Sequence, residues 1–202
     1  MRARTALGAG ALALLGAALW SRKNPSACPY SQRVWVEAPH PIITRARLRL
    51  VLDPSPGERV LEVGPGTGYY TLDVAEWVGP EGVVEIFDLQ QEMLDHTLRR
   101  AGERGLENVI PTRGDATGLP YEDDSFDAAL LVAVLGEFPE PDAALHELRR
   151  VLKPGGRLVV GELFGDPHFT TFASLRHRAE EASLFLDDRS GNWFGYFARF
   201  LK

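Results

Sequence analysis

The feature that most constrains the fold is a short apolar run that ends in three closely spaced glycines. Residues 59–68 read RVLEVGPGTG, so a strand-like run leads directly into Gly64, Gly66 and Gly68. Glycine lets the backbone turn sharply and approach a ligand closely because it has no Cβ. The spacing is G-x-G-x-G, whereas the dinucleotide fingerprint is G-x-G-x-x-G, and Tyr69 stands where its third glycine would be. The run therefore predicts a strand followed by a ligand-binding turn.

From about residue 40, short apolar runs alternate with amphipathic stretches, which is typical of a parallel sheet covered by helices. The run at 126–132 is almost continuously apolar, as expected for a central strand that is buried on both faces. Ser-Gly-Asn at 190–192 is a turn signal that predicts antiparallel pairing, because a parallel return needs a longer crossover. We expect strands at 59–63, 82–88, 109–113, 126–132, 157–162, 184–188 and 193–200, and helices at 41–52, 70–78, 92–105, 142–152 and 170–182.

Length and composition indicate one globular domain with an N-terminal appendage, divided into residues 1–25 and 26–202. The chain has 202 residues, 45% hydrophobic and 25% charged, which excludes a disordered or low-complexity chain. Its one cysteine, Cys28, excludes an internal disulfide and a cysteine-based zinc site. We expect no metal site and an inert Cys28, since no sequence neighbour activates its thiol. The net charge of −6 argues against nucleic-acid binding.

The net charge conceals two unlike parts. Residues 1–50 contain eight Lys or Arg and one Glu, whereas the rest of the chain has 14 basic and 27 acidic side chains. Residues 5–20 (TALGAGALALLGAALW) carry no charge and are bracketed by Arg2 and Arg4 before them and Arg22 and Lys23 after them.

Residues 5–20 are expected to be a membrane anchor. As a helix they would span about 24 Å, less than the about 30 Å of a bilayer core. The segment would therefore tilt, thin the bilayer or lie in the interface, with the flanking basic residues on anionic lipid. A secretory signal peptide and a disordered segment are the alternatives, and the first is disfavoured because Arg22 and Lys23 stand where a small-residue cleavage site should be.

Acidic or glycine-rich features follow four of the predicted strands. Glu62 and the glycines end the first strand, Asp88 ends the second, Asp115 follows the third, and residues 132–137 follow the fourth. In open α/β sheets, ligands bind outside the carboxyl ends of the strands. Several acidic groups at these ends favour a cationic ligand and disfavour a pyrophosphate.

Four segments carry a resemblance to a known family. LEVGPGTGYYTLDVA, FDLQQEML, GDATGLPYEDDSFD and ALHELRRVLKPGGRL, in this order and spacing, resemble class I S-adenosylmethionine-dependent methyltransferases, and within them the small ubiquinone/menaquinone-biosynthesis branch. The resemblance covers about residues 40–202 and implies a methyltransferase domain over 26–202. It implies an α/β fold with a Rossmann-like, doubly wound, mostly parallel seven-stranded sheet of order 3-2-1-4-5-7-6, the last strand antiparallel. S-adenosyl-L-methionine is the implied cofactor.

The resemblance also implies roles for residues at the first two strand ends. Glu62 and the Gly64–Gly68 loop would hold the methionine part of the cofactor. Asp88 would bind the ribose diol, and Leu89 would pack on the adenine. A charged acceptor is well suited to the diol, because each hydrogen bond to a charged group contributes about 1.5–3 kcal/mol.

The next two strand ends would complete the cofactor site. By the same resemblance, Asp115 would accept from the adenine amino group and the backbone N–H of Ala116 would serve a ring nitrogen. Val132 would line the methyl-donor side.

No residue is specified as catalytic. Methyl transfer from a sulfonium is an in-line displacement, so positioning in a dry pocket is the main contribution of the enzyme. A general base is needed only where the acceptor must lose a proton. The candidates are His168, which follows the fifth strand, His40, which precedes the first helix, and Glu137 and Tyr70; a structural or solvated role is the alternative for both histidines.

The acceptor is not specified by sequence. The chain lacks a long insertion after the fifth strand, so only residues 26–45 and 163–170 remain to cover the site. A thin cover beside an expected anchor favours a small lipid- or quinone-like acceptor and a cytoplasmic, membrane-associated domain. The alternatives are a non-catalytic S-adenosylmethionine-binding protein at the membrane and an NAD(P)-dependent oxidoreductase, which Tyr69 and the acidic strand ends disfavour.

Overall fold

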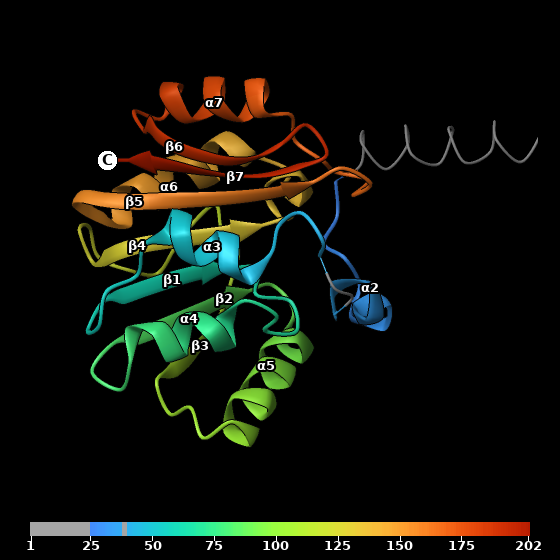
Figure 1. The fold of residues 1–202 in the computed structure, drawn as a ribbon, viewed down its shortest axis with the longest axis vertical. Coiled ribbons are helices and arrows are strands. Elements are labelled where there is room, and N and C mark those ends of the chain that lie inside the picture. Colours follow the sequence, from blue (N-terminus) through green and yellow to red (C-terminus); the bar gives the residue numbers. More distant parts are fainter. Residues whose placement is uncertain (1–24, 38–39) are drawn as a thin grey trace, which may run out of the picture.

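The computed structural model describes residues 25–37 and 40–202, and a twisted sheet runs through them (Figure 1). The sheet has seven strands in the order β3-β2-β1-β4-β5-β7-β6. Neighbours from β3 to β5 pair in parallel, whereas β7 is antiparallel to both β5 and β6. The predicted strand order and antiparallel last strand are confirmed. The strands are β1 (Arg59–Val63), β2 (Val83–Asp88), β3 (Val109–Arg113), β4 (Phe126–Val132), β5 (Leu152–Leu163), β6 (Phe185–Asn192) and β7 (Gly195–Leu201).

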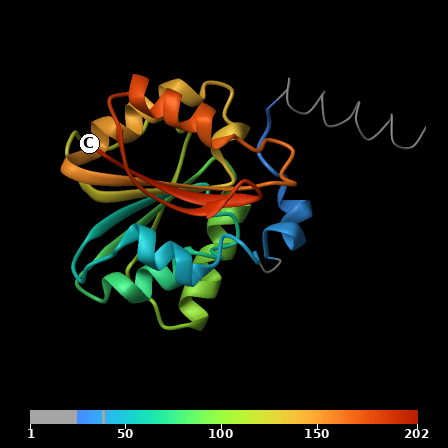
Figure 2. The same cartoon turned by 45° about the horizontal axis from the view of Figure 1, so that its top comes forward.

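Helices cover both faces of the sheet (Figure 2). One layer contains α3, α4 and α5, and the other contains α6 and α7. The short elements η1 and α2 lie beyond the carboxyl ends of the parallel strands (Figure 1). The bounds are η1 (Tyr30–Gln32), α2 (Arg33–Glu37), α3 (Arg45–Leu52), α4 (Thr71–Val78), α5 (Gln91–Glu103), η2 (Leu135–Glu137), α6 (Pro141–Val151) and α7 (Phe172–Glu181).

Two hydrophobic cores, one on each face, explain the continuous apolar runs. In β4, Leu131 packs towards α6 and α7, whereas Leu130 packs towards α3, α4 and α5. Successive side chains of a strand point to opposite faces, so both must be apolar when both faces are covered. In β1, Leu61 and Val60 divide between the two cores in the same way.

Three element boundaries differ from the sequence prediction by more than two residues. Helix α3 begins at Arg45 instead of residue 41, because the Thr44 side chain accepts from the Arg47 N–H and caps the helix. Strand β5 begins at Leu152 instead of residue 157, and its register against β4 shifts where the chain passes through the Pro-Gly-Gly segment. Strand β6 continues to residue 192, so the predicted turn at 190–192 is wrong and the reversal lies at 193–194.

The described chain starts beside the carboxyl edge of the sheet. Pro25 lines a small cavity together with Phe138 and Phe169. Within residues 25–37 and 40–202, no helix has the length and apolar character needed to cross a membrane. The expected anchor, residues 5–20, lies outside the described residues.

Replacing a core leucine of α6 tests the packing of the layer that α6 and α7 form. Leu148 is fully buried, so Leu148→Ala should lower the free energy of unfolding by about 2–5 kcal/mol. Leu50 on α3 is 77% exposed, so the matched Leu50→Ala variant should change it by less than about 0.5 kcal/mol. Urea unfolding measures both, and equal effects of the two substitutions would contradict the assigned core.

Candidate active site

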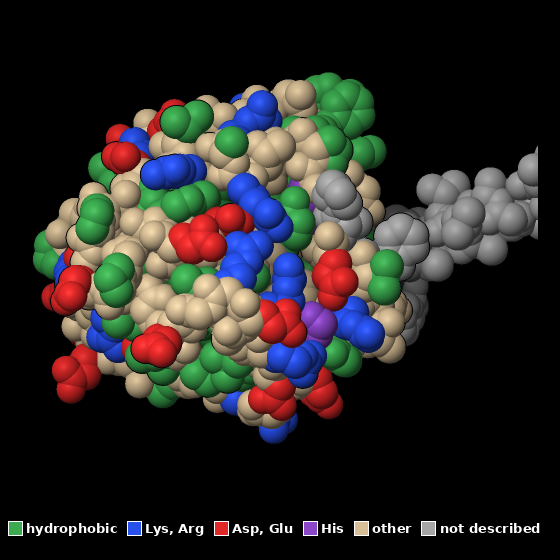
Figure 3. All heavy atoms as spheres, turned by 60° about the horizontal axis from the view of Figure 1, so that its bottom comes forward, with side chains coloured by type: hydrophobic (Ala, Val, Ile, Leu, Met, Phe, Trp, Pro, Cys, Tyr) green, Lys and Arg blue, Asp and Glu red, His purple; other side chains and the backbone are tan. Residues whose placement is uncertain are grey.

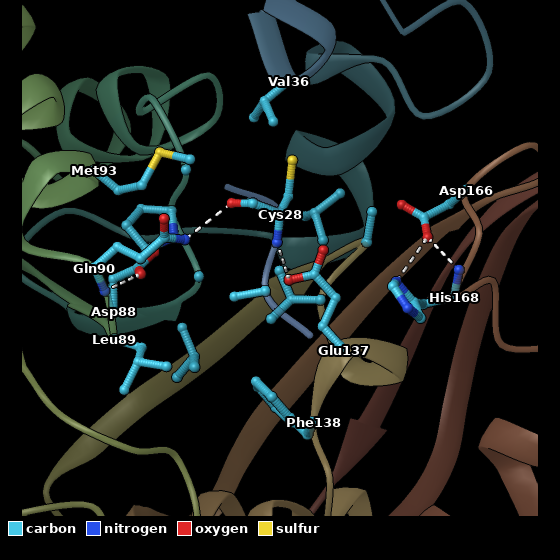
Figure 4. Close-up of a pocket in the computed structure, with 18 of the residues that line it drawn as sticks. Cys28, Val36, Asp88, Leu89, Gln90, Met93, Glu137, Phe138, Asp166 and His168 are labelled. Atoms are coloured by element: carbon cyan, nitrogen blue, oxygen red, sulfur yellow. Dashed lines mark hydrogen bonds and ion pairs between the residues drawn. The ribbon is translucent and has the colours of Figure 1, made fainter. Parts of the chain in front are cut away.

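A cavity of about 900 Å³ lies at the carboxyl ends of β1, β2 and β4 (Figure 4). The glycine-rich loop, residues 26–43 and residues 163–168 contribute the rest of its wall. Among its described lining residues there is no Lys or Arg. The carboxyl groups that line it belong to Glu62, Asp88, Asp115, Glu137 and Asp166.

The glycine-rich loop leaves no room for side chains at its first two glycines. Gly64 has a φ of 69°, and a Cβ there would lie 2.6 Å from Val134. Gly66 has a φ of 56°, and a Cβ there would lie 2.7 Å from Val36 of α2. Both positions therefore require glycine for conformation and for space. Gly68 lies outside the cavity lining and packs against α5.

Glu62 places a buried carboxylate at the end of β1. Its side chain is almost fully buried, and no described group makes a hydrogen bond to Oε2. Burial raises its pKa to about 7, and the nearby Thr71 hydroxyl opposes part of this shift. A buried polar atom without a partner is costly, so a ligand that brings an ammonium or N–H group would stabilise Glu62.

Asp88 presents a second carboxylate at the end of β2. The Gln90 N–H donates to Asp88 Oδ1 at 2.8 Å, as the dashed line in Figure 4 shows. Burial raises the pKa of Asp88 to about 6, although the backbone N–H groups of Gln90 and Leu89 lower it in part. Leu89 follows directly and lines the cavity with a half-exposed side chain.

The loop after β3 supplies the next part of the wall. Asp115 Oδ1 accepts from the backbone N–H and the hydroxyl of Thr117, at 2.9 and 2.8 Å. These hydrogen bonds lower the pKa of Asp115 and hold its carboxylate in one orientation. Ala116 is buried beside it, and Val132 lines the cavity from the end of β4.

Residues 25–32, which we call the N-terminal strap, are tied to two strand ends. Gln90 Nε2 donates to the Cys28 carbonyl at 2.9 Å, and Gln90 Oε1 accepts from the Tyr30 N–H at 3.1 Å. The Cys28 N–H donates to Glu137 Oε2 at 3.2 Å (Figure 4). The sequence indicated neither Cys28 nor Gln90 as a cavity residue, because these contacts join segments at least 60 residues apart.

Glu137 and Asp166 place acidic groups on the side of the cavity away from Asp88 (Figure 4). Burial, together with the charges of Asp166 and Asp88, raises the pKa of Glu137 to about 8, against a smaller opposing effect of the Cys28 N–H. Burial also raises the pKa of Asp166, whose Oδ1 accepts from the His168 N–H at 2.7 Å. Nδ1 of His168 lies 4.0 Å from the same oxygen.

His40 and Tyr70 form a polar contact beside the glycine-rich loop. The Tyr70 hydroxyl donates to the Ile43 carbonyl at 2.6 Å, so Nδ1 of His40, 3.0 Å away, must be the donor to the tyrosine oxygen. Burial raises the pKa of Tyr70 and lowers the pKa of His40. The pair therefore links the segment before α3 to the loop after β1.

The structure brings all four catalytic candidates, His168, His40, Glu137 and Tyr70, to this one cavity. Eight of the nine expected cofactor-binding residues also line it: Glu62, Gly64, Gly66, Asp88, Leu89, Asp115, Ala116 and Val132.

Comparisons with known proteins agree with this architecture. Residues 60–156 match the family described as a methyltransferase domain. The chain is 39% identical over 135 residues to a demethylmenaquinone methyltransferase of Renibacterium salmoninarum, covering 65% of this chain and 53% of that protein. It is 41% identical over 108 residues to the ubiquinone/menaquinone biosynthesis C-methyltransferase UbiE of Teredinibacter turnerae, covering 53% and 43%. The chain thus spans about half the length of these curated relatives.

A solved structure shows the same fold over nearly its whole length. The S-adenosylmethionine-dependent methyltransferase from Aquifex aeolicus superposes with a TM-score of 0.74 at 22% identity, covering 87% of this chain and 99% of that chain. Such a sheet, with a ligand cavity at its carboxyl edge, is typical of α/β proteins that bind a nucleoside-containing cofactor. The chain is therefore similar in sequence to methyltransferases of ubiquinone and menaquinone biosynthesis, and it shares the fold of an S-adenosylmethionine-dependent methyltransferase.

The cofactor of this class fits the cavity. S-adenosylmethionine carries an ammonium and a sulfonium, and the lining offers carboxylates and no described Lys or Arg. The unpartnered Oε2 of Glu62 and the close backbone approach at Gly64 are features that such a ligand would use.

The raised carboxyl pKa values predict that stability without cofactor falls as pH rises. Burial raises the pKa of Glu62 to about 7, and it raises the pKa of Glu137 and of Glu162, a buried residue of β5, to about 8, above the about 4.3 of an exposed Glu. Between about pH 5 and 8 the folded state therefore binds more protons than the unfolded state, which lowers the free energy of unfolding with increasing pH.

Thermal unfolding from pH 5.5 to 8.5 measures this effect. Glu137→Gln should flatten the decline, whereas the exposed Glu92→Gln should leave it unchanged. Stability that increases with pH over this range would contradict the assigned pKa shifts.

Proposed function

We propose that the protein transfers the methyl group of S-adenosylmethionine to a small quinone- or lipid-like acceptor bound in this cavity. The observation that carries the proposal is the convergence of Glu62, Gly64 and Asp88 at one end of a cavity whose described lining has no Lys or Arg. The proposed roles are those of the family pattern. Glu62 and the glycine-rich loop bind the methionine part, Asp88 the ribose hydroxyls, Leu89, Asp115 and Ala116 the adenine, and Val132 lines the methyl side.

The remainder of the cavity is suited to an apolar ring. Phe138, Val134 and Leu163 line it together with the N-terminal strap, so a bound acceptor would lie against apolar walls. The two curated relatives bear names of ubiquinone and menaquinone biosynthesis, which supports a quinol-like acceptor. The cofactor supplies an electrophilic methyl group on a sulfonium.

Glu137 is the group that we assign to proton removal from the acceptor. Its carboxyl lines the cavity from η2, and its pKa of about 8 makes it a far stronger base than an exposed glutamate. When the acceptor gains the methyl group, its displaced proton passes to the Glu137 carboxylate. His168, next to Asp166, is the second candidate base, and His40 and Tyr70 position the cover of the site.

A lipid-like acceptor agrees with the expected membrane association on the cytoplasmic side. Residues 5–20 supply an uncharged apolar segment, and the chain enters the described fold at residue 25, close to the site. Two other functions would give different results in the experiments below. A non-catalytic binding protein would bind S-adenosylmethionine without turnover, and an oxidoreductase would show no S-adenosylmethionine binding in the calorimetry.

Asp88→Asn should weaken S-adenosylmethionine binding by roughly tenfold to a hundredfold. The substitution removes charged hydrogen bonds to the ribose, each of which contributes about 1.5–3 kcal/mol. Titration calorimetry with S-adenosylmethionine measures the change, and Asp95→Asn on the exposed part of α5 is the matched control. Wild-type affinity in Asp88→Asn would refute the assigned ribose site.

Methyl-tritiated S-adenosylmethionine tests the reaction itself. Incubation with a short-chain demethylmenaquinol and, separately, with membrane lipid extract should place label in the organic phase. Glu137→Gln should lower this turnover by about a hundredfold or more while retaining cofactor affinity, because general bases contribute about 10²–10⁴-fold.

Asp88→Asn serves as the low-affinity control in the same assay. Label only in water-soluble products would contradict a lipid-like acceptor. Binding without label in any fraction would contradict methyl transfer.

A further inference from the structure

Three aromatic side chains are exposed at one tip of the fold, where β5 ends and β6 turns into β7. Phe164, Trp193 and Phe194, which we call the aromatic tip, are 53%, 65% and 41% exposed. The Trp193 and Phe194 ring centroids are 3.5 Å apart, and Phe164 lies 5.7 Å from Trp193 and 5.9 Å from Phe194. Contiguous exposed apolar surface of this kind marks an interaction site more often than a scattered hydrophobic residue does.

The backbone holds the aromatic tip in place. The Phe194 N–H donates to Oδ1 of Asn192 at 2.9 Å, which closes the turn between β6 and β7. The Phe164 N–H donates to the Phe194 carbonyl at 2.7 Å, which joins the end of β5 to this turn. The rings are thus displayed by a fixed scaffold, so a partner that covers them does not have to order a flexible loop.

The aromatic tip lacks the charges that cover much of the remaining surface. Residues 190–197 read SGNWFGYF and contain no Lys, Arg, Asp or Glu. In the space-filling view, hydrophobic side chains gather at the upper right edge, whereas charged side chains are spread over the rest of that face (Figure 3). Burying this tip in an apolar layer would therefore not carry a formal charge with it.

The aromatic tip lies beside the cavity and beside the start of the described chain. Leu163 and Gly165, the two neighbours of Phe164, line the large cavity. The Phe169 ring lies 5.8 Å from Phe164, and Phe169 shares a small cavity with Pro25. The described chain thus begins, at Pro25, close to the aromatic tip. In the sequence, the uncharged residues 5–20 and the basic pair at 22 and 23 precede this point.

We infer that the aromatic tip docks into the interfacial region of a lipid bilayer and turns the cavity towards the membrane. Aromatic rings, and tryptophan above all, are favoured at this depth. Stable peripheral binding takes two signals. The aromatic tip supplies one, and the uncharged residues 5–20 with their basic flank, which precede residue 25 in the sequence, would supply the other. The docking is inferred from the geometry of the aromatic tip alone. That it would let a lipid-like acceptor enter the cavity rests on the proposed function.

Vesicle flotation of the full chain tests the docking surface. With vesicles of phosphatidylcholine and phosphatidylglycerol, the double substitution Phe164→Ser and Trp193→Ser should weaken binding by roughly tenfold, because each ring loses part of its burial in the interface. Phe185→Ser is the matched control, since Phe185 is 63% exposed at the opposite end of β6. Unchanged binding of the double variant would overturn the inference.

Quenching by brominated lipids reports directly on Trp193. Wild-type fluorescence should contain a component that brominated lipid quenches and that Trp193→Phe lacks, while the other three tryptophans are common to both proteins. Equal quenching of the two proteins would overturn the inference, as would a dimer that the double substitution dissociates, which would show a second copy on the tip. S-adenosylmethionine affinity should be unchanged in all these variants, so failure of the docking surface and failure of the cofactor site give different results.

Discussion

Burial of the central strands on both faces is the constraint on which the rest of this structure depends. β1 and β4 lie between two helical layers, so their side chains must be apolar along nearly their whole length. Polar side chains of these strands can therefore contact a ligand only at the strand ends, which the helical layers leave uncovered. Glu62 stands next to the last residue of β1, and Asp88 is the last residue of β2, so the parallel arrangement brings the two carboxylates to one edge.

Concentrating carboxyl groups in one cavity has an electrostatic consequence. Burial raises the pKa of Glu62, Asp88 and Glu137, the charges of Asp166 and Asp88 raise that of Glu137 further, and no described Lys or Arg lines the cavity to offset this. The protein without ligand is therefore less stable at neutral pH than it would be with neutral side chains at these positions. A bound cationic cofactor would favour the ionised carboxylates, so its binding would be coupled to the ionisation of these groups.

Sequence patterns predicted most of the helices and strands. They gave wrong boundaries where residues typical of turns lie inside a paired strand. Residues at 190–192 have turn chemistry, yet β6 continues through them, because the Asn192 side chain caps the turn that follows. A strand was expected only from residue 157, yet β5 begins at Leu152 and includes the proline and glycines at 154–156 as an irregularity against β4. Pairing with neighbouring strands set both boundaries, and the preferences of the residues in one segment do not predict that pairing.

The amino-acid sequence by itself determined the alternation of strands and helices and placed acidic and glycine-rich residues at the strand ends that line the cavity. It could do so because periodicity, the glycine spacing and acidic residues at strand ends are local features of the chain. The strand order was expected from the resemblance to a known family, and the structure has that order. Only the tertiary structure decided the contacts of the N-terminal strap with the cavity and the assembly of the aromatic tip. Cys28 reaches Gln90 and Glu137, and Phe164 reaches Trp193, through contacts between distant segments. Such contacts depend on how the loops pack after the sheet has formed, and local sequence does not encode them.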